Sequence, residues 1–132
     1  MNPAKTLLTL FIVAIMFSLT SCQENRSIDL NFCHHVYFWL NNPDNPADRE
    51  TFENGIAELL EIPEIKSYHF GIPAPGTVDR EVVDGSYTYS YLIFFDSPEA
   101  QDIYQDHPLH HKFIDNCSHL WDRVVVYDSV LK

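Results

Sequence analysis

The strongest strand pattern in the chain is Tyr87-Thr-Tyr-Ser-Tyr-Leu-Ile-Phe-Phe95, where large apolar residues alternate at first with small polar ones. Side chains of a strand alternate between its two faces, so the odd-numbered residues share one face while Leu92 and Phe94 lie on the other. The alternation predicts a β-strand over this stretch, and the flanking segments indicate how that strand fits into a fold.

The segment before this strand contains two further strand patterns and one helix pattern. Phe32–Leu40 is apolar or aromatic on both faces, which predicts a central strand covered on each side. Asp48 can cap a helix whose apolar residues follow helical spacing until Pro63 ends it. A second strand is predicted over residues 65–70.

The segment after this strand predicts helical structure and a last strand. Ser97 is a capping residue followed by a proline, so a helix is expected from Pro98 to about Asp106. Pro108 interrupts this helix and can start another helical segment with an apolar stripe. Residues 123–130 are rich in valine and predict the last strand.

The order strand, helix, strand, strand, helix, strand is typical of the ferredoxin-like α+β fold. Both helices would cover one face of the sheet and leave the other face bare. The apolar side chains expected on the bare face are Val36, Phe38, Leu92, Phe94, Val125 and Tyr127. Apolar surface of this extent favours a homodimer in which the two sheet faces pack together.

The amino-terminal segment has the composition of a secretory signal. Lys5 precedes an apolar stretch at 7–17, and small residues follow it up to Cys22. This stretch is shorter than the about 20 apolar residues that a membrane-spanning helix needs. Leu19-Thr-Ser-Cys22 resembles a bacterial lipobox, which implies lipid on Cys22. An ordinary signal peptide and an uncleaved anchor helix are the alternatives.

The expected processing divides the chain into three parts. Residues 1–21 are the signal peptide, 22–31 form a short polar tether, and 32–132 form one small domain with one core. The lipid would hold the exported domain at the bacterial cell envelope, on its periplasmic or surface side, because two or more acyl chains anchor a protein stably.

The part of the chain after the signal is strongly acidic. All 19 Asp and Glu residues follow Cys22, whereas one of the eight basic residues precedes it. This charge argues against nucleic acid and an anionic membrane surface as partners, and it favours solubility. A Gly-rich phosphate loop, a Gly-x-Ser-x-Gly sequence and a Cys-x-x-Cys pair are all absent from the sequence, which disfavours nucleotide hydrolysis, serine hydrolysis and thiol redox chemistry.

Cysteine and histidine residues are the candidates for a disulfide and a metal site. Cys33 and Cys117 are expected to be two buried thiols, with a disulfide between them as the alternative. His107, His110 and His111 lie close together in the sequence, but their spacing matches no established zinc motif. The sequence therefore predicts neither a metal site nor a cofactor.

Two segments with histidines are candidates for a site, namely the first strand and Tyr104-Gln-Asp-His-Pro-Leu-His110. By alternation, His35 and Tyr37 share one strand face and His34 lies on the other. Helical spacing places His110 on the apolar stripe of its helix. If the strand face with His35 meets the helix stripe with His110, both histidines face one apolar space. His34 then lies at the dimer interface.

With these segments the chain resembles the Dabb family, the stress-responsive dimeric α/β barrel domains. The resemblance covers about 32–130 and rests on His35 before a hydrophobic strand, on the tyrosine-rich strand, on Tyr104 with His107-Pro-x-His110, and on the terminal Val-Val-Val-Tyr-Asp128. It implies the same ferredoxin-like fold, with two copies forming a dimeric α/β barrel.

The resemblance also implies candidate site residues. Some plant members of this family are polyketide cyclases, in which the second histidine of His-Pro-x-His is the general base and a preceding tyrosine assists it. His110 and Tyr104 stand at these positions. Together with the strand alternation, the resemblance gives as expected ligand-binding residues His35, Tyr37, Tyr89, Phe113 and Trp121. A cyclase cavity histidine is replaced here by Tyr89, and a cavity tyrosine by Gly55.

Three functional hypotheses follow from these residues. The leading one is a membrane-anchored domain that binds a small apolar or aromatic molecule between sheet and helices. The second is a cyclase or lyase that uses His110 as general base with Tyr104. The third is a structural, stress-protective dimer whose interior is only core. The loop between Gly71 and Gly85 can gate a cavity or bind a partner.

Overall fold

The structure, a computed structural model, describes residues 30–77 and 79–132. The elements are β1 (Phe32–Leu40), α2 (Pro46–Leu59), β2 (Ser67–Gly71), β3 (Tyr89–Phe95), α3 (Pro98–Gln105), α4 (Pro108–Cys117), a 3₁₀ turn (Ser118–Leu120) and β4 (Trp121–Val130). The four strands form one antiparallel sheet in the order β2-β3-β1-β4. This topology confirms the ferredoxin-like α+β fold.

Three of the sequence predictions lie outside the described residues. They are the signal peptide, the lipid on Cys22 and most of the tether, of which the structure describes the last two residues. Within the described ranges, no helix has both the length and the apolar character that are needed to cross a membrane.

Capping side chains determine where the helices begin. The side chain of Asn45 accepts a hydrogen bond from the backbone N–H of Ala47, so α2 begins at Pro46. The prediction that Asp48 caps this helix is therefore wrong, and Asp48 lies in its first turn. Ser97 caps α3 as predicted, by accepting a hydrogen bond from Ala100 N–H.

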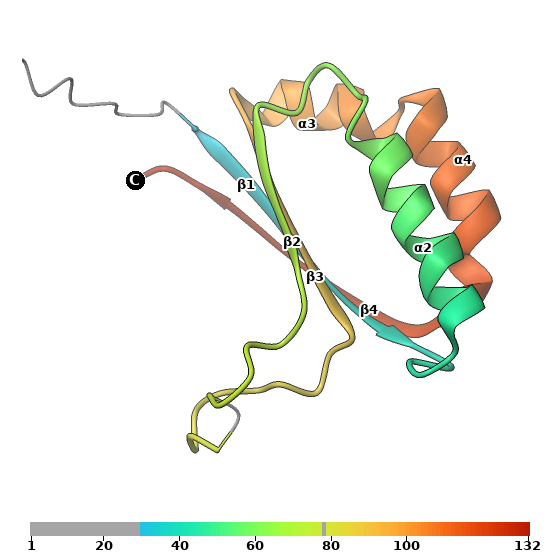
Figure 1. The fold of residues 1–132 in the computed structure, drawn as a ribbon. Helices are drawn as coiled ribbons and strands as arrows, with labels where there is room; N and C mark the ends of the chain where they lie inside the picture. The colour runs from blue at the N-terminus through green and yellow to red at the C-terminus, as the bar shows by residue number, and fades with distance from the viewer. Residues whose placement is uncertain (1–29, 78) are drawn as a thin grey trace, which may run out of the picture.

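The helices α2, α3 and α4 all cover one face of the sheet, and the opposite face is open (Figure 1). On β1, His34, Val36 and Phe38 are buried beneath the helices. His35 and Tyr37 alternate with them and face the open side. The predicted orientation of β1 is thus wrong, because both faces of this strand are apolar and alternation alone does not distinguish the helix side.

The other two long strands are oriented as predicted. Tyr91 and the other odd-numbered residues of β3 are buried on the helix side, and Leu92 and Phe94 lie on the open face. On β4, Val125 and Tyr127 pair with residues on the open face of β1. The bare face therefore holds four of the six apolar residues expected there.

Aromatic side chains dominate the core between sheet and helices. The ring of Phe52 on α2 stacks on Tyr89 with 5.1 Å between centroids and meets Phe38 edge-on at 4.9 Å. Helices α2 and α4 approach closely at Gly55, where a Cβ atom would be 2.7 Å from the Sγ atom of Cys117. Glycine therefore permits this helix packing.

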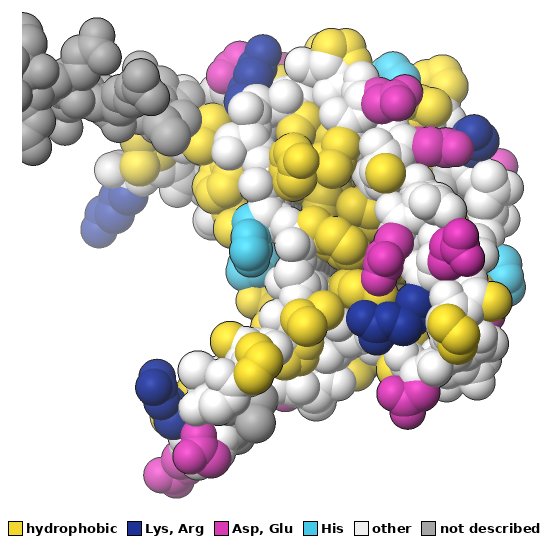
Figure 2. Space-filling model, viewed as in Figure 1, with side chains coloured by type: hydrophobic (Ala, Val, Ile, Leu, Met, Phe, Trp, Pro, Cys, Tyr) yellow, Lys and Arg dark blue, Asp and Glu magenta, His cyan; other side chains and the backbone are white. Residues whose placement is uncertain are grey.

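The segment between β2 and β3 is not part of the sheet and projects beyond it (Figure 1). Acidic and basic side chains lie at its tip (Figure 2), and the exposed residues of this segment include Asp79 and Arg80. Tyr87, predicted to lie in the strand, belongs to this segment, and its ring packs against Tyr37 with 4.9 Å between centroids. Tyr87 thus adds to the aromatic surface of the open face.

Candidate ligand-binding site

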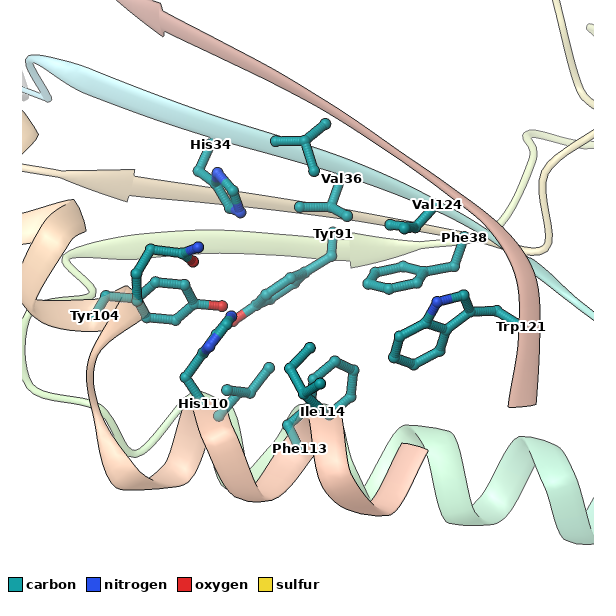
Figure 3. Close-up of a pocket in the computed structure, with 13 residues that line it drawn as sticks. His34, Val36, Phe38, Tyr91, Tyr104, His110, Phe113, Ile114, Trp121 and Val124 are labelled. Atoms are coloured by element: carbon teal, nitrogen blue, oxygen red, sulfur yellow. The ribbon is translucent and has the colours of Figure 1, made fainter. Parts of the chain in front are cut away.

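A cavity of about 190 Å³ lies between the sheet and the helices, beside α4. Its apolar wall is formed by Val36, Phe38, Leu59, Phe113, Ile114, Trp121, Val124 and Val126 (Figure 3). Val124 and Val126 are 43% and 45% exposed, so they border the mouth of the cavity along the edge strand β4. The cavity is thus accessible from solvent and mainly apolar.

Polar groups gather at one end of this cavity. The hydroxyls of Tyr91 on β3 and Tyr104 on α3 point toward one another, and the ring of His110 on α4 lies beside them (Figure 3). The Tyr104 ring lies 5.0 Å from the His110 ring and 6.0 Å from the His34 ring, measured between centroids. Four elements thus bring two phenols and two imidazoles together.

The Tyr91 hydroxyl is buried without a hydrogen-bond partner among the described residues. The residue is only 1% exposed. The Tyr104 hydroxyl faces it closely enough to raise the pKa of Tyr91 further, but the two hydroxyls do not meet the geometry of a hydrogen bond. Because an unpaired buried hydroxyl costs about 1–3 kcal/mol, the Tyr91 hydroxyl is suited to bind a polar group of a ligand.

Burial keeps both phenols in their neutral form. It raises the pKa of Tyr91 and that of Tyr104 far above the usual tyrosine value. Both hydroxyls therefore retain their hydrogens at neutral pH and can donate a hydrogen bond into the cavity.

His34 forms the shortest polar contact at this site. Its Nδ1 atom lies 2.6 Å from the Oδ1 atom of Asp128 on β4. A carboxylate oxygen can only accept, so Nδ1 of His34 carries the hydrogen. The Nε2 atom of a neutral His34 is then an acceptor on the cavity side of the ring. The expectation that His34 lies at the dimer interface is wrong, because β1 turns this side chain toward the helices, and Asp128 was not among the predicted site residues.

His110 is half-buried and has an imidazole suited to stay neutral. Burial lowers its pKa below the usual histidine value, His111 and His34 lower it further, and a hydrogen bond with the Gln105 backbone offsets part of this effect. A neutral imidazole can accept a proton or a hydrogen bond from a ligand.

The first histidine of the His-Pro-x-His sequence has a structural role. The Nδ1 atom of His107 accepts a hydrogen bond from Leu109 N–H at 3.1 Å and caps α4, and Pro108 follows as the first helical residue. The helix start then brings His110, one turn later, to the cavity.

The predicted site residues separate into two groups in the structure. Tyr104, His110, Phe113 and Trp121 line the cavity, as expected. Three others do not line it, namely His35, Tyr37 and Tyr89. The expectation that His35 and His110 face one space is thus wrong, because β1 turns its other face to the helices.

Tyr89 has a structural environment of its own. It is buried, its ring stacks on Phe52, and its hydroxyl donates a hydrogen bond to Glu53. The guanidinium of Arg49 lies 4.9 Å from its ring centroid. This tyrosine is therefore paired, in contrast to Tyr91 two residues later on the same face.

The cysteines and histidines provide neither a disulfide nor a metal site within the structure that is described. Cys33 and Cys117 are both free. Cys33 is partly exposed, on the open side of β1, whereas Cys117 is buried in α4 beneath Gly55. Across residues 30–77 and 79–132, no three His, Cys, Asp or Glu side chains are grouped so that they could hold a metal ion.

Residues 32–131 match the family model of the stress responsive A/B barrel domain, Dabb. The chain belongs to the Dabb family. No curated protein matches the chain. The family assignment agrees with the ferredoxin-like topology and spans all four strands and all three helices described above.

Solved structures similar to this Dabb domain cover about three quarters of the chain. A dimeric ferredoxin-like protein of unknown function from Thermobifida fusca is 24% identical, with 76% of this chain and 91% of that chain covered and a TM-score of 0.61. A hypothetical protein of Arabidopsis thaliana is 26% identical, with coverage of 77% and 88% and a TM-score of 0.60. A hydroxynitrile lyase from Passiflora edulis is 19% identical, with coverage of 76% and 93% and a TM-score of 0.64.

Proposed function

We propose that this Dabb domain binds a small, neutral, aromatic or otherwise apolar molecule in the cavity between sheet and helices. One observation carries the proposal: the buried Tyr91 hydroxyl has no partner in the described structure and points into the polar end of the cavity. A ligand oxygen placed between Tyr91, Tyr104 and His110 would complete their hydrogen bonds.

The size and the lining of the cavity define the class of ligand. An apolar cavity of about 150 Å³ accommodates benzene, and the cavity here measures about 190 Å³. Its lining contains no Lys or Arg. A buried anion would therefore lack a positively charged partner, which disfavours charged ligands. A single aromatic ring with one hydroxyl or carbonyl group fits both properties.

The test is a binding measurement with phenol as the neutral probe and benzoate as the charged one. The protein is the chain from residue 22 onward with Cys22→Ser, which keeps the whole core, since the core residues lie between Phe32 and Leu120. Protein-detected NMR would follow shifts of the cavity side chains during titration. We expect phenol to bind and benzoate to bind more weakly or not at all.

Variants separate binding in the cavity from binding elsewhere. Ile114→Trp should block the mouth, and Tyr91→Phe should weaken phenol binding about tenfold by removing one hydrogen bond. Tyr127→Phe, on the open face, is the matched control and should bind like the parent chain. Equal phenol affinity in Ile114→Trp and the parent chain would contradict the proposal.

A second candidate function is catalysis of proton transfer on such a ligand, as a lyase or cyclase. The observation that favours it is the pair of imidazoles at the polar end, with His34 oriented by Asp128 and His110 kept neutral by burial. On an aromatic cyanohydrin, His110 would remove the hydroxyl proton while Tyr104 donates a hydrogen bond to the oxygen. The carbon–cyanide bond then breaks, an aldehyde forms, and the cyanide takes up the proton.

Turnover distinguishes this candidate from binding alone. Aldehyde release from an aromatic cyanohydrin is followed by absorbance in the parent chain, His110→Gln and Tyr104→Phe. An enzyme of this type requires a loss of about 100-fold or more in kcat for His110→Gln. Binding of phenol without any aldehyde release would contradict the enzyme candidate and support ligand binding alone.

The open face of the sheet supports a homodimer as part of the proposal. Its half-buried apolar side chains include Tyr37, Leu92, Phe94 and Val125, and covering such a face removes it from water. A protein of the same fold from Thermobifida fusca is described as dimeric. A second copy packed sheet to sheet would form an α/β barrel with both cavities on its outer sides.

Membrane anchoring through Cys22 completes the proposal. The support is the signal-like sequence before Cys22 and the lipobox-like Leu19-Thr-Ser-Cys22. The domain would then lie at the bacterial cell envelope, on the periplasmic or surface side. Incorporation of labelled fatty acid into the chain, and its loss in Cys22→Ala, would support this placement. Labelling that persists in Cys22→Ala would contradict it.

A further inference from the structure

The open face of the sheet carries His35 on the central strand β1 and His69 on the edge strand β2. His35 on β1 pairs with Leu92 on β3 and with Tyr127 on β4, and Leu92 pairs with His69 on β2. Residues paired in this way share a face of the sheet. His69, Leu92, His35 and Tyr127 therefore form one row across all four strands, on the side away from the helices.

Among the described residues, no carboxylate lies directly beside His35 on the open face. The titratable groups that face it are Cys33 and Tyr37 on β1, His69 on β2 and Tyr127 on β4. Strand β3 contributes Leu92, which does not titrate. Asp128, the nearest acid along β4, lies on the helix side, bound to His34.

The charged groups described on the open face lie toward the end of β1 that contains Trp39. Asp84 and Arg123 lie beside Trp39, and the Arg123 guanidinium is 4.1 Å from the Trp39 ring centroid. Trp39 is four residues further along β1 than His35. A proton on His35 would therefore lack a directly opposed acid in the single chain.

Even in the single chain, the surroundings of His35 favour its neutral form. Burial lowers its pKa below the usual histidine value, and the neighbouring His34 and His69 lower it further. A second sheet packed over this row would remove the remaining water from the ring, and it would bring further copies of both histidines into the same interface.

We propose that protonation of His35 separates the two copies, so that the dimer is stable near neutral pH and dissociates in mildly acidic solution. This inference rests on the proposed sheet-to-sheet dimer. Two neutral His35 rings per dimer must each gain a charge as the copies separate. By linkage, the dimer dissociation constant should rise about 10- to 100-fold between about pH 7.5 and about pH 5.5.

The experiment measures the dissociation constant by sedimentation velocity at about pH 7.5 and about pH 5.5, at equal ionic strength. The chain from residue 22 onward with Cys22→Ser is compared with the same chain carrying His35→Gln. Glutamine is polar but does not titrate, so we expect the ratio of the two constants to fall close to one. His119→Gln, at an exposed position in the 3₁₀ turn outside the sheet, is the control and should keep the full ratio.

The outcomes distinguish a pH effect on the dimer from the existence of the dimer. A monomer at about pH 7.5 would overturn the proposed dimer. A dimer with the same dissociation constant at both pH values would overturn the inference and leave the dimer intact. An undiminished ratio in His35→Gln would place the responsible proton elsewhere and also overturn it. His35→Phe, a second variant without a titrating group, and near-UV circular dichroism at both pH values exclude unfolding as the cause.

Discussion

His34 and Asp128 lie directly opposite each other on neighbouring strands, and their side chains meet beneath the helices with 2.6 Å between Nδ1 and Oδ1. The imidazole is 8% exposed and the carboxylate 45%. The acid therefore fixes the orientation of a buried ring from the edge strand β4, where solvent still reaches the carboxylate.

Removal of this acid should change the tautomer of His34. Asp128→Ala is expected to shift the ring from the Nδ1–H form toward the Nε2–H form and to lower the free energy of unfolding by about 1 kcal/mol, since the carboxylate is partly solvated. Nitrogen-detected NMR of labelled histidine reports the tautomer, and urea denaturation reports stability. Asp128→Asn keeps an acceptor and should retain the Nδ1–H form; an unchanged tautomer in Asp128→Ala would show that the carboxylate does not set it.

The hydroxyl of Tyr91 should contribute nothing to stability in the absence of a ligand. Tyr91→Phe removes an unpaired buried group, so the free energy of unfolding should stay the same or rise by about 1 kcal/mol. Tyr89→Phe on the same strand is the control, because it removes the hydrogen bond to Glu53 and should cost about 1 kcal/mol. Urea denaturation measures both. A loss in Tyr91→Phe as large as that in Tyr89→Phe would show that the Tyr91 hydroxyl is paired in solution.

The stability of the fold should fall in mildly acidic solution, in part through His110. Its pKa is lowered in the folded chain by burial, so the unfolded chain binds more protons once the pH falls below about 6.5. The contribution of the neutral ring is thus present above about pH 6.5 and lost below it. His110→Gln should reduce this pH dependence, with His119→Gln as the unchanged control. A steeper loss of stability with falling pH in His110→Gln would contradict the lowered pKa assigned to His110.

The contact between α2 and α4 should not tolerate a side chain at Gly55. A Cβ atom there would lie 2.7 Å from Cys117 Sγ and 3.0 Å from a ring carbon of Phe113. Gly55→Ala should therefore destabilise the fold by about 1–3 kcal/mol, although alanine favours a helix by about 1 kcal/mol. In a Cys117→Ala background, the same change should cost less. Thermal denaturation of the four variants measures the coupling, and purely additive effects would contradict a direct clash.

Most of the fold was predictable because it depends on local signals. The alternation of Tyr87–Phe95, the cap at Ser97 and the proline at 108 predicted elements that the structure shows within a few residues. Signals of this kind act over one or two helical turns and are visible in the sequence. The roles of Tyr104 and His110 were instead implied by the family resemblance, and the two residues lie on consecutive helices separated by a turn.

The composition of the cavity was predicted only in part. Phe113 and Trp121 line it as expected, but His34 and Tyr91 replace His35 and Tyr89 as its polar contributors from the strands. The error on β1 is a shift of one residue, which exchanges the two faces of the strand. A strand with apolar residues on both faces gives no local signal for choosing between them.

The sequence by itself determined the order of strands and helices, the capped helix starts and the position of His110 in the first turn of its helix, because periodicity and capping act between near neighbours. Only the tertiary structure decided which face of β1 meets the helices, that Tyr91 is buried without a partner, and that Asp128 meets His34 across 94 positions of sequence. These features depend on packing between distant segments, where the burial of the whole apolar surface selects one arrangement.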